Sequence, residues 1–303
     1  NGMPKGYENE ISKQEYKKLV DLAVSIVKKR FTIDAVKEGT IHLKEGQELR
    51  ELNLHNLIEK MAEDRPNLAA IVGEHFNNIF ISLDEQKKID PQNFETVRKY
   101  LSLRIYPVEM IRQRGGAASM VVTTHLEDTY TLLMLDLPGA FVPVDKEMFL
   151  LWKKHSSEIF KIAQQNVNTQ EIEKLSHTLD LGDAKIEVTI LSDDNYAASY
   201  ALDLVNNSPE LVGEWGSVVA MPNKAIVNLC KVSKDKPVDF VKFIQLIKPI
   251  VEKSYKEHPQ PISDQFFWYY KGKFTRINVV VEADGRINVI SPMGLTALMT
   301  ESK

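Results

Sequence analysis

Two arginines stand directly before a glycine pair in the segment LRIYPVEMIRQRGG, which spans residues 103–116. In an extended chain Arg112 and Arg114 share one face, because side chains two residues apart point the same way. Guanidinium groups bind carboxylates and phosphates through paired hydrogen bonds, and glycines let the backbone approach a ligand closely. The same pattern is typical of a solvated basic loop, since most arginines lie at the surface. We expect a loop that carries surface arginines, with an anion-binding site as the alternative.

A histidine stands close to two acidic residues in the segment THLEDTY (124–130). His125 beside Glu127 and Asp128 supplies residue types that give or take a proton in general acid–base catalysis. The segment lies between two expected strands, however, and Asp followed by Thr is typical of a turn. We therefore expect a turn here, with proton transfer by His125 as the alternative.

Two adjacent carboxylates, Asp193 and Asp194, precede NYAASY at the point where an expected strand passes into an expected helix. Paired carboxylates can bind a cation. An Asp at such a junction also caps the free N–H groups of a helix and meets the positive end of its dipole, and we prefer this interpretation. The seven histidines include no pair spaced three to five residues apart on an expected helix, so the sequence predicts no metal site.

An enzyme site would require the fold to bring scattered residues together, because the common catalytic motifs are missing from the sequence. No Gly-rich phosphate loop, G-x-S-x-G or H-E-x-x-H occurs in the 303 residues. The residues that such a site could use are Arg112, Arg114, His125, Asp136 and Asp194. They would serve a hydrolase or transferase that acts on a small phosphorylated or carboxylated substrate. The sequence predicts no cofactor.

The charge and composition of the chain narrow its expected partners. There are 38 basic and 42 acidic side chains, a net charge of -4, which predicts no general attraction to nucleic acid. The N-terminal residues lack the apolar core of a signal peptide, and no apolar run approaches the roughly 18–20 residues of a membrane span. We expect a cytoplasmic protein without membrane contact. The single cysteine, Cys230, lies in the apolar run AIVNLCKV and is expected to be buried.

Hydrophobic periodicity and turn residues predict helices and strands along the chain. Expected helices lie at 12–31, 53–63, 67–80, 145–167, 194–205 and 237–257. Ser12 and Glu15 are spaced as in a capping box at the start of the first helix, and two short strands around Gly39 predict a hairpin. Expected strands lie at 103–111, 118–126, 129–137, 140–144, 185–191 and 216–232, with a hairpin turn at MPNKA in the last range. Adjacent strands are often joined by tight turns, which indicates an α+β fold with mixed, mainly antiparallel sheets, packed helices and strand–helix–hairpin blocks. A polar stretch divides a helix–hairpin–helix region (1–90) from a main α+β domain (91–303).

Five segments follow one another in an order typical of one protein family. They are LRIYPVEMIR, TYTLLMLDLPGAFVPVDKEMFLLWKKHSSEIFKIAQQNV, DDNYAASYALDL, GSVVAMPNKAIVNLCKV and PQPISDQFFWYYKGKF. The positions that match are Pro107, Arg112, Asp136, Asp145, Asp194, Tyr196, Ala198, Ser199 and Met221 to Asn223. Over about residues 100–282 the chain resembles the YtpQ-like bacterial proteins, which share a domain of unknown function, number 1444 of that series. The family hairpin often has an acidic residue where Lys224 or Ala225 stands here.

The resemblance implies a bacterial, cytoplasmic protein and supplies no reaction, cofactor or catalytic residue. Our leading hypothesis is a non-enzymatic binding or regulatory protein that recognises a protein partner or a small anionic ligand. Trp215 and Trp268 could anchor such a protein partner, although we expect both in the core. The alternatives are the hydrolase or transferase described above and an immunity-type protein that neutralises a toxin.

Overall fold

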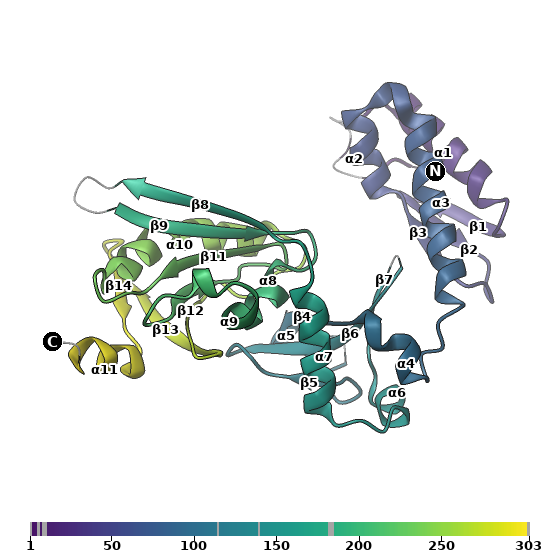
Figure 1. The fold of residues 1–303 in the computed structure, drawn as a ribbon. Helices are drawn as coiled ribbons and strands as arrows, with labels where there is room; N and C mark the ends of the chain where they lie inside the picture. Colours follow the sequence, from purple (N-terminus) through teal and green to yellow (C-terminus); the bar gives the residue numbers. More distant parts are fainter. Residues whose placement is uncertain are drawn as a thin grey trace. The chain divides into compact units, whose positions relative to one another are not determined.

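The chain forms two compact units, residues 1–89 and residues 90–303, in a computed structural model. The structure describes residues 2–4, 7, 11–113, 115–138, 140–180 and 185–301 (Figure 1). The sequence analysis placed the boundary one residue later. Sheets and helices are combined in both units, and all the pairings between strands are antiparallel in the described ranges, which confirms the α+β class.

The first unit packs helices on a small antiparallel sheet. Its helices are α1 (Lys13–Val27), α2 (His55–Glu63) and α3 (Leu68–Gln86), with a 3-10 turn at Arg65–Asn67. Its sheet has the order β1 (Ile33–Lys37), β2 (Thr40–Leu43), β3 (Glu51–Asn53). The capping box of α1 forms, because Ser12 Oγ accepts from the N–H of Glu15 and the Glu15 carboxylate accepts from the N–H of Ser12. The hairpin turns at Gly39, whose φ of 78° favours glycine.

The second unit contains two sheets. Its helices are α4 (Phe94–Val97), α5 (Val108–Gln113), α6 (Lys146–Leu151), α7 (Ser156–Asn168), α8 (Ala197–Tyr200), α9 (Leu204–Asn207), α10 (Asp239–Glu257) and α11 (Met293–Glu301), and its 3-10 turns lie at Arg98–Tyr100, Ala201–Asp203 and Pro209–Leu211. A four-stranded sheet consists of β4 (Leu101–Pro107), β5 (Val122–Thr123), β6 (Thr129–Leu137) and β7 (Ala140–Pro143). The remaining strands form a seven-stranded sheet.

The seven-stranded sheet has a hydrophobic core on the face that α10 covers. Its order is β14 (Ile287–Ile290), β13 (Lys273–Val281), β12 (Phe266–Tyr270), β10 (Ser217–Ala220), β11 (Ile226–Lys231), β9 (Lys185–Ser192), β8 (Glu173–Asp180). Helix α10 lies along one face (Figure 1), where its buried phenylalanines pack with Trp215 and Trp268. Both tryptophans are therefore core residues and do not anchor a partner. Burial also raises the pKa of the Cys230 thiol to about 12, which agrees with the expected apolar setting.

The four-stranded sheet has two faces that matter for the candidate sites. Helix α7 covers one face, where Leu103 of β4 points, and we call this the α7 face (Figure 1). Residues directly opposite in an antiparallel pair point to the same side. Arg104 lies opposite Leu132, and Asp136 lies opposite Phe141. These four residues consequently occupy the other face, which we call the Arg104 face.

The structure differs from the sequence prediction where backbone geometry interrupts a periodic pattern. The expected strand 103–111 ends at Pro107 and continues as helix α5, whose first N–H, on Val108, donates to Asp128 O (3.0 Å). The expected helix 145–167 is two helices, because Lys153 adopts a left-handed φ of 51° between α6 and α7. The expected helix 194–205 is likewise broken into α8, a 3-10 turn and α9. The residues of β8 are all exposed, so the strand has no buried face that would require alternating apolar and polar residues. The sequence analysis therefore missed this strand.

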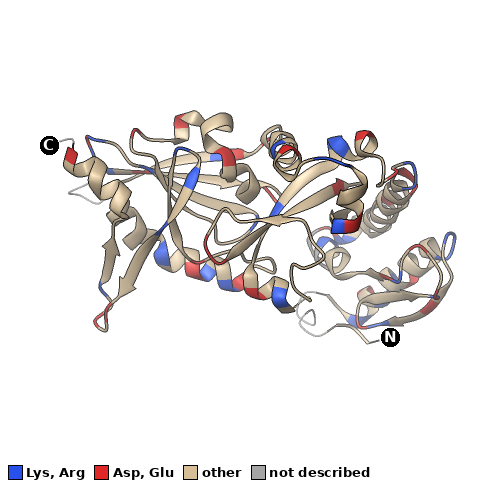
Figure 2. Cartoon of the chain, turned by 90° about the horizontal axis from the view of Figure 1, so that it is seen from below, with Lys and Arg blue, Asp and Glu red and all other residues tan. Residues whose placement is uncertain are grey.

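Basic and acidic residues are interspersed along the described chain (Figure 2).

Two turns predicted from the sequence are present. The hairpin predicted at MPNKA joins β10 to β11, and the segment around Glu127 and Asp128 is a turn whose carboxylates pair with Arg276. Among the described residues, none of the helices combines the length and the apolar character that a bilayer crossing requires.

Candidate functional site

Arg104 is a charged residue in the middle of a buried strand. It is 6% exposed, and its guanidinium lies 3.8 Å from the centre of the Phe141 ring. Its Nη1 donates to Gln260 Oε1 (3.0 Å), and its Nη2 donates to Asn195 Oδ1 (2.9 Å). Both acceptors are neutral amide oxygens on loops far away in the sequence. A buried guanidinium is usually paired with a carboxylate, so this pairing is unusual.

Lys224 approaches the same acceptor from the turn between β10 and β11. Its Nζ donates to Asn195 Oδ1 (3.0 Å), so two cations converge on a single amide oxygen. The turn is fixed by Asn223, whose side-chain oxygen accepts from the N–H groups of Ala225 and Ile226. Burial lowers the pKa of Lys224, and the positive charge of Arg104 lowers it further.

The Arg104 face keeps unused hydrogen-bonding capacity. Burial lowers the pKa of Arg104, and its Nε has no hydrogen-bond partner among the described residues. The buried hydroxyl of Ser102, two residues earlier on the same face of β4, also has none. Within the part of the chain that the structure describes, neither Arg104 nor Lys224 forms an ion pair with a carboxylate. Buried donors without partners are costly, so this face is suited to accept an additional group.

Asp136 and Tyr196 form a second pair on this face. The Tyr196 hydroxyl donates to the Asp136 carboxylate, and the Tyr196 ring contacts Phe141 at 5.7 Å between centroids. Burial raises the pKa of Asp136, and the charge of Arg104 partly opposes that increase. We call the whole group the Arg104 cluster: Arg104, Asp136, Phe141, Asn195, Tyr196, Lys224 and Gln260.

The loop that carries Asn195 is held by the carboxylate predicted to cap a helix. Asp193 Oδ1 accepts from the N–H groups of Asn195 (2.7 Å) and Tyr196 (2.6 Å), which fixes the backbone of both residues. Asp193 does not cap α8, because the N-cap of that helix is Tyr196 and no side chain caps it. Asp194 is exposed, and its negative charge raises the pKa of the Lys224 ammonium. The acidic pair thus has a positioning role through Asp193, and Asp194 lies at the rim of the cluster.

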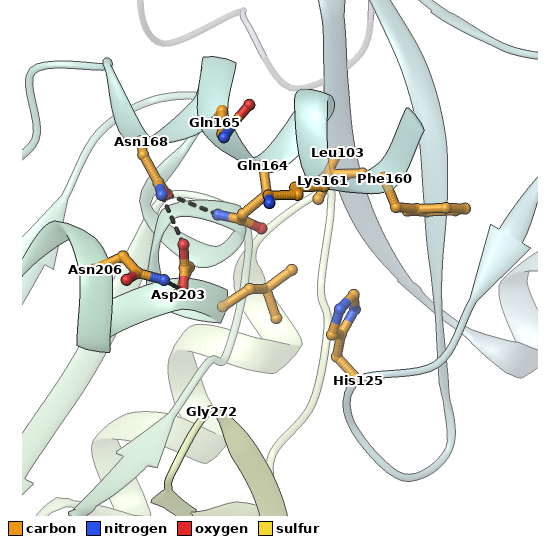
Figure 3. Close-up of a pocket in the computed structure, with 11 residues that line it drawn as sticks. Leu103, His125, Phe160, Lys161, Gln164, Gln165, Asn168, Asp203, Asn206 and Gly272 are labelled. Atoms are coloured by element: carbon orange, nitrogen blue, oxygen red, sulfur yellow. Dashed lines mark hydrogen bonds between the residues drawn. The ribbon is translucent and has the colours of Figure 1, made fainter. Parts of the chain in front are cut away.

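A separate pocket of about 710 Å³ lies on the α7 face. Figure 3 shows His125 on one side of it and, opposite, side chains of helix α7 together with Asp203 and Asn206. We call it the α7 pocket; its lining is Leu103, His125, Phe160, Lys161, Gln164, Gln165, Asn168, Leu202, Asp203, Asn206 and Gly272. The Nδ1 atom of His125 lies 2.8 Å from Thr131 Oγ1, and burial lowers the pKa of this histidine. His125 is therefore neutral near pH 7.

The structure does not assemble the site expected from Arg112, His125, Asp136 and Asp194. Arg112 lies on helix α5, is exposed and pairs with Glu109 at 3.7 Å, because the segment is helical where an extended chain was expected. Arg114 lies outside the described residues. Thr131, which His125 contacts, and Asp136 lie five residues apart in β6, so their side chains point to opposite faces of the sheet. His125 and Asp136 are therefore on opposite faces. Asp136 belongs to the Arg104 cluster, and Asp194 lies at its rim.

The sequence analysis missed Arg104, Asn195 and Lys224. A signal for Arg104 was present, because an arginine between Leu103 and Ile105 in a buried strand needs a polar partner. The partners themselves lie 91 and 156 residues away along the chain, so no local pattern could identify them. Each of the five segments quoted for the family resemblance contributes at least one residue to the cluster, the last one through Gln260.

The comparisons with known proteins assign no relative to the chain: no family model, curated protein or solved structure matches it. No group of three or more His, Cys, Asp or Glu residues in the described ranges is arranged to hold a metal ion.

Proposed function

We propose that residues 90–303 form a binding module whose ligand is a small oxyanion, held by Arg104 and Lys224. The observation that supports the proposal best is the convergence of these two cations on Asn195 Oδ1, at 2.9 and 3.0 Å. An amide oxygen carries only a partial negative charge, whereas an anionic oxygen attracts two cations at the same distance more strongly. A carboxylate or phosphate oxygen would therefore bind these donors better than the side chain that now occupies the position.

The present partners of Arg104 can be replaced at small cost. Gln260 is exposed, so water can satisfy its amide once a ligand takes the Nη1 hydrogen bond. Asn195 is half-buried and is fixed through its backbone, so its side chain can rotate without moving the loop. The negative charges of Asp136 and Asp193 act on Arg104 and weaken the positive field.

Titration calorimetry of the full chain with succinate and, separately, with inorganic phosphate tests this proposal. We expect saturable binding of at least one of the two, and the tighter one identifies the anion class. Lys224→Gln should weaken that binding at least about tenfold, the effect of roughly 1.4 kcal/mol. Lys234→Gln is the matched control, because Lys234 is an exposed lysine that pairs with Glu214 at 2.8 Å.

Binding that Lys224→Gln leaves unchanged would exclude this site as the location of the anion. The absence of binding to both probes would reject the proposed function. In either case the fold should survive the change of Lys224, since this half-buried ammonium contributes one hydrogen bond to a neutral amide oxygen.

A second candidate function, hydrolysis of a small phosphorylated substrate, is favoured by the contact of Tyr196 with Asp136. A carboxyl whose pKa is raised by burial can give or take a proton near a bound anion. An enzyme of this kind should release nitrophenol from nitrophenyl phosphate, and Asp136→Asn should abolish the release. No release by the unchanged chain would leave the binding function as the better description.

The proposed family and cellular location rest on the quoted segments. The order of LRIYP, LDLPGAF, DDNYAAS, AMPNKA and FFWYYKGKF supports the proposal that the chain is a YtpQ-like protein of the bacterial cytoplasm. Fractionation of the source cells with an antibody against the chain would test the location. Recovery in a membrane or extracellular fraction would contradict it.

A further inference from the structure

The α7 pocket is polar, and its half-buried charge, the Asp203 carboxylate, is held by amide donors. The Asp203 carboxylate accepts from Asn168 Nδ2 and from Asn206 Nδ2, both at 2.7 Å, so each of its oxygens already has an amide donor. His125 is neutral because burial lowers its pKa. Lys161 is exposed at the edge of the pocket. The carboxylate keeps its negative charge, and its remaining lone pairs can accept from hydroxyl groups.

The hydrogen-bonding groups that stay open in the pocket are mostly neutral acceptors. Gln164 uses its amide nitrogen for Asn168 Oδ1 and Ser199 O, which leaves its side-chain oxygen open. Asn206 uses its nitrogen for Asp203, which also leaves an oxygen. The side chain of Gln165 adds an exposed donor and acceptor (Figure 3). A complementary ligand must therefore present several O–H or N–H donors without a charge.

Apolar side chains form part of the same lining. Leu103 and Leu202 are buried, and the ring of Phe160 is half-buried beside them. Ligand sites commonly combine such an apolar surface with a few polar groups that fix the orientation of the ligand. A molecule with hydroxyl groups on its edge and C–H groups on its face fits both halves of this lining. The volume of about 710 Å³ is within the range of small-molecule pockets.

We infer that the α7 pocket is a second ligand site, separate from the Arg104 cluster, and that it binds an uncharged polyhydroxylated molecule of the monosaccharide or disaccharide class. The site does not depend on the anion proposal, because the two lie on opposite faces of the four-stranded sheet. Sugar binding should not displace a bound oxyanion.

Nuclear magnetic resonance with D-glucose, D-mannose, D-galactose and maltose as probes tests this inference on the full chain. We expect at least one sugar to shift the ring signals of His125 in a saturable manner at millimolar concentration. Asn206→Ala and Gln165→Ala should each weaken that sugar at least about threefold, because each removes one open acceptor.

Asn288→Ala is the matched control, since Asn288 is also an exposed asparagine whose amide donates to a carboxylate, Glu282 at 2.8 Å. It should leave sugar binding unchanged. No shift at His125 with any of the four sugars would overturn the inference, and so would a shift that Asn206→Ala and Gln165→Ala leave intact. Succinate and phosphate binding, measured on the same sample, reports separately on the Arg104 cluster.

Discussion

The two faces of the four-stranded sheet differ in the charged groups that they present and in the hydrogen-bond partners of those groups. On the Arg104 face two cations share one neutral oxygen, and the Nε atom of Arg104 has no partner in the described part of the chain. On the α7 face a single carboxylate, Asp203, receives two amide donors, and the histidine opposite it is neutral. One face therefore presents two cations that share a neutral oxygen, whereas the other presents a carboxylate held by two amides beside neutral acceptors.

Adjacent side chains of one strand can therefore lie in chemically different sites. Leu103 and Arg104 are neighbours in β4, yet they point into different environments because strand side chains alternate. The residues quoted from the sequence as one catalytic group were divided by the same alternation. Variants of residues on the two faces test this contrast.

The largest effect is expected from Arg104→Met, which removes the buried charge but keeps a long apolar side chain over Phe141. Oxyanion affinity should fall at least about a hundredfold, roughly 2.7 kcal/mol. The fold should survive, since replacing a poorly paired buried charge by an apolar residue is often neutral. Calorimetry measures the affinity, and tryptophan fluorescence verifies folding, because all three tryptophans of the chain lie in residues 90–303. A variant that folds and still binds as tightly would contradict the role of Arg104.

Tyr196→Phe should have a smaller effect, on stability. The change removes the hydroxyl that donates to Asp136, and a hydrogen bond to a charged group contributes about 1.5–3 kcal/mol. We expect a loss of about 1–2 kcal/mol at pH 7, measured as the urea midpoint of the fluorescence transition. The matched variant Tyr106→Phe alters a half-buried tyrosine on the same face and should cost less. Equal costs for both would show that the Asp136 contact contributes nothing specific.

Acidification should change the contributions of Asp136 and His125 to the free energy of unfolding in opposite directions. The pKa of Asp136 is raised in the folded state, so its contribution favours folding at low pH and declines as the pH rises above 3.8. The pKa of His125 is lowered, so its contribution is complete above pH 6.5 and is lost as the pH falls below that value.

Urea midpoints of Asp136→Asn and His125→Gln, measured between pH 4 and pH 7, test these two pH dependences of stability. His125→Gln should lose the decline in stability below pH 6.5, and Asp136→Asn should lose the decline above pH 3.8. The pKa of His75 is also lowered by burial, but this residue belongs to the first unit, which contains no tryptophan. Two variants with identical pH profiles would contradict the contrast between the faces.

The smallest effect is expected from Arg112→Ala. Its side chain is 71% exposed and pairs only with Glu109 on the same short helix at 3.7 Å. Stability should change by less than about 0.5 kcal/mol, and oxyanion affinity should change less than about twofold. Calorimetry and urea unfolding measure both quantities. A large loss of affinity would restore the anion site first suspected at the glycine pair.

The sequence predicted those parts of the structure that depend on neighbours along the chain. The capping box of Ser12 and Glu15, the hairpin at Gly39 and the turn at MPNKA each rest on local chemistry, and each is present. The left-handed residue Lys153 was not predictable, because no glycine or asparagine marks that position. The candidate site was predicted only in part, through Asp136 and Asp194, because Arg104, Asn195 and Lys224 meet through contacts between distant segments.

The most direct test of the anion site is the melting temperature of Asn195→Asp, followed by tryptophan fluorescence. The change places a carboxylate where the amide oxygen now accepts from Arg104 and Lys224, so the chain would carry its own anion. We expect the melting temperature of the second unit to rise by about 2–4 °C, the effect of roughly 1 kcal/mol in a domain of this size. Succinate and phosphate binding should be lost. Asn288→Asp, at an exposed asparagine outside the cluster, should show neither change. A lower melting temperature for Asn195→Asp would mean that repulsion from Asp193 and Asp194 outweighs the two cations, and it would contradict the anion site.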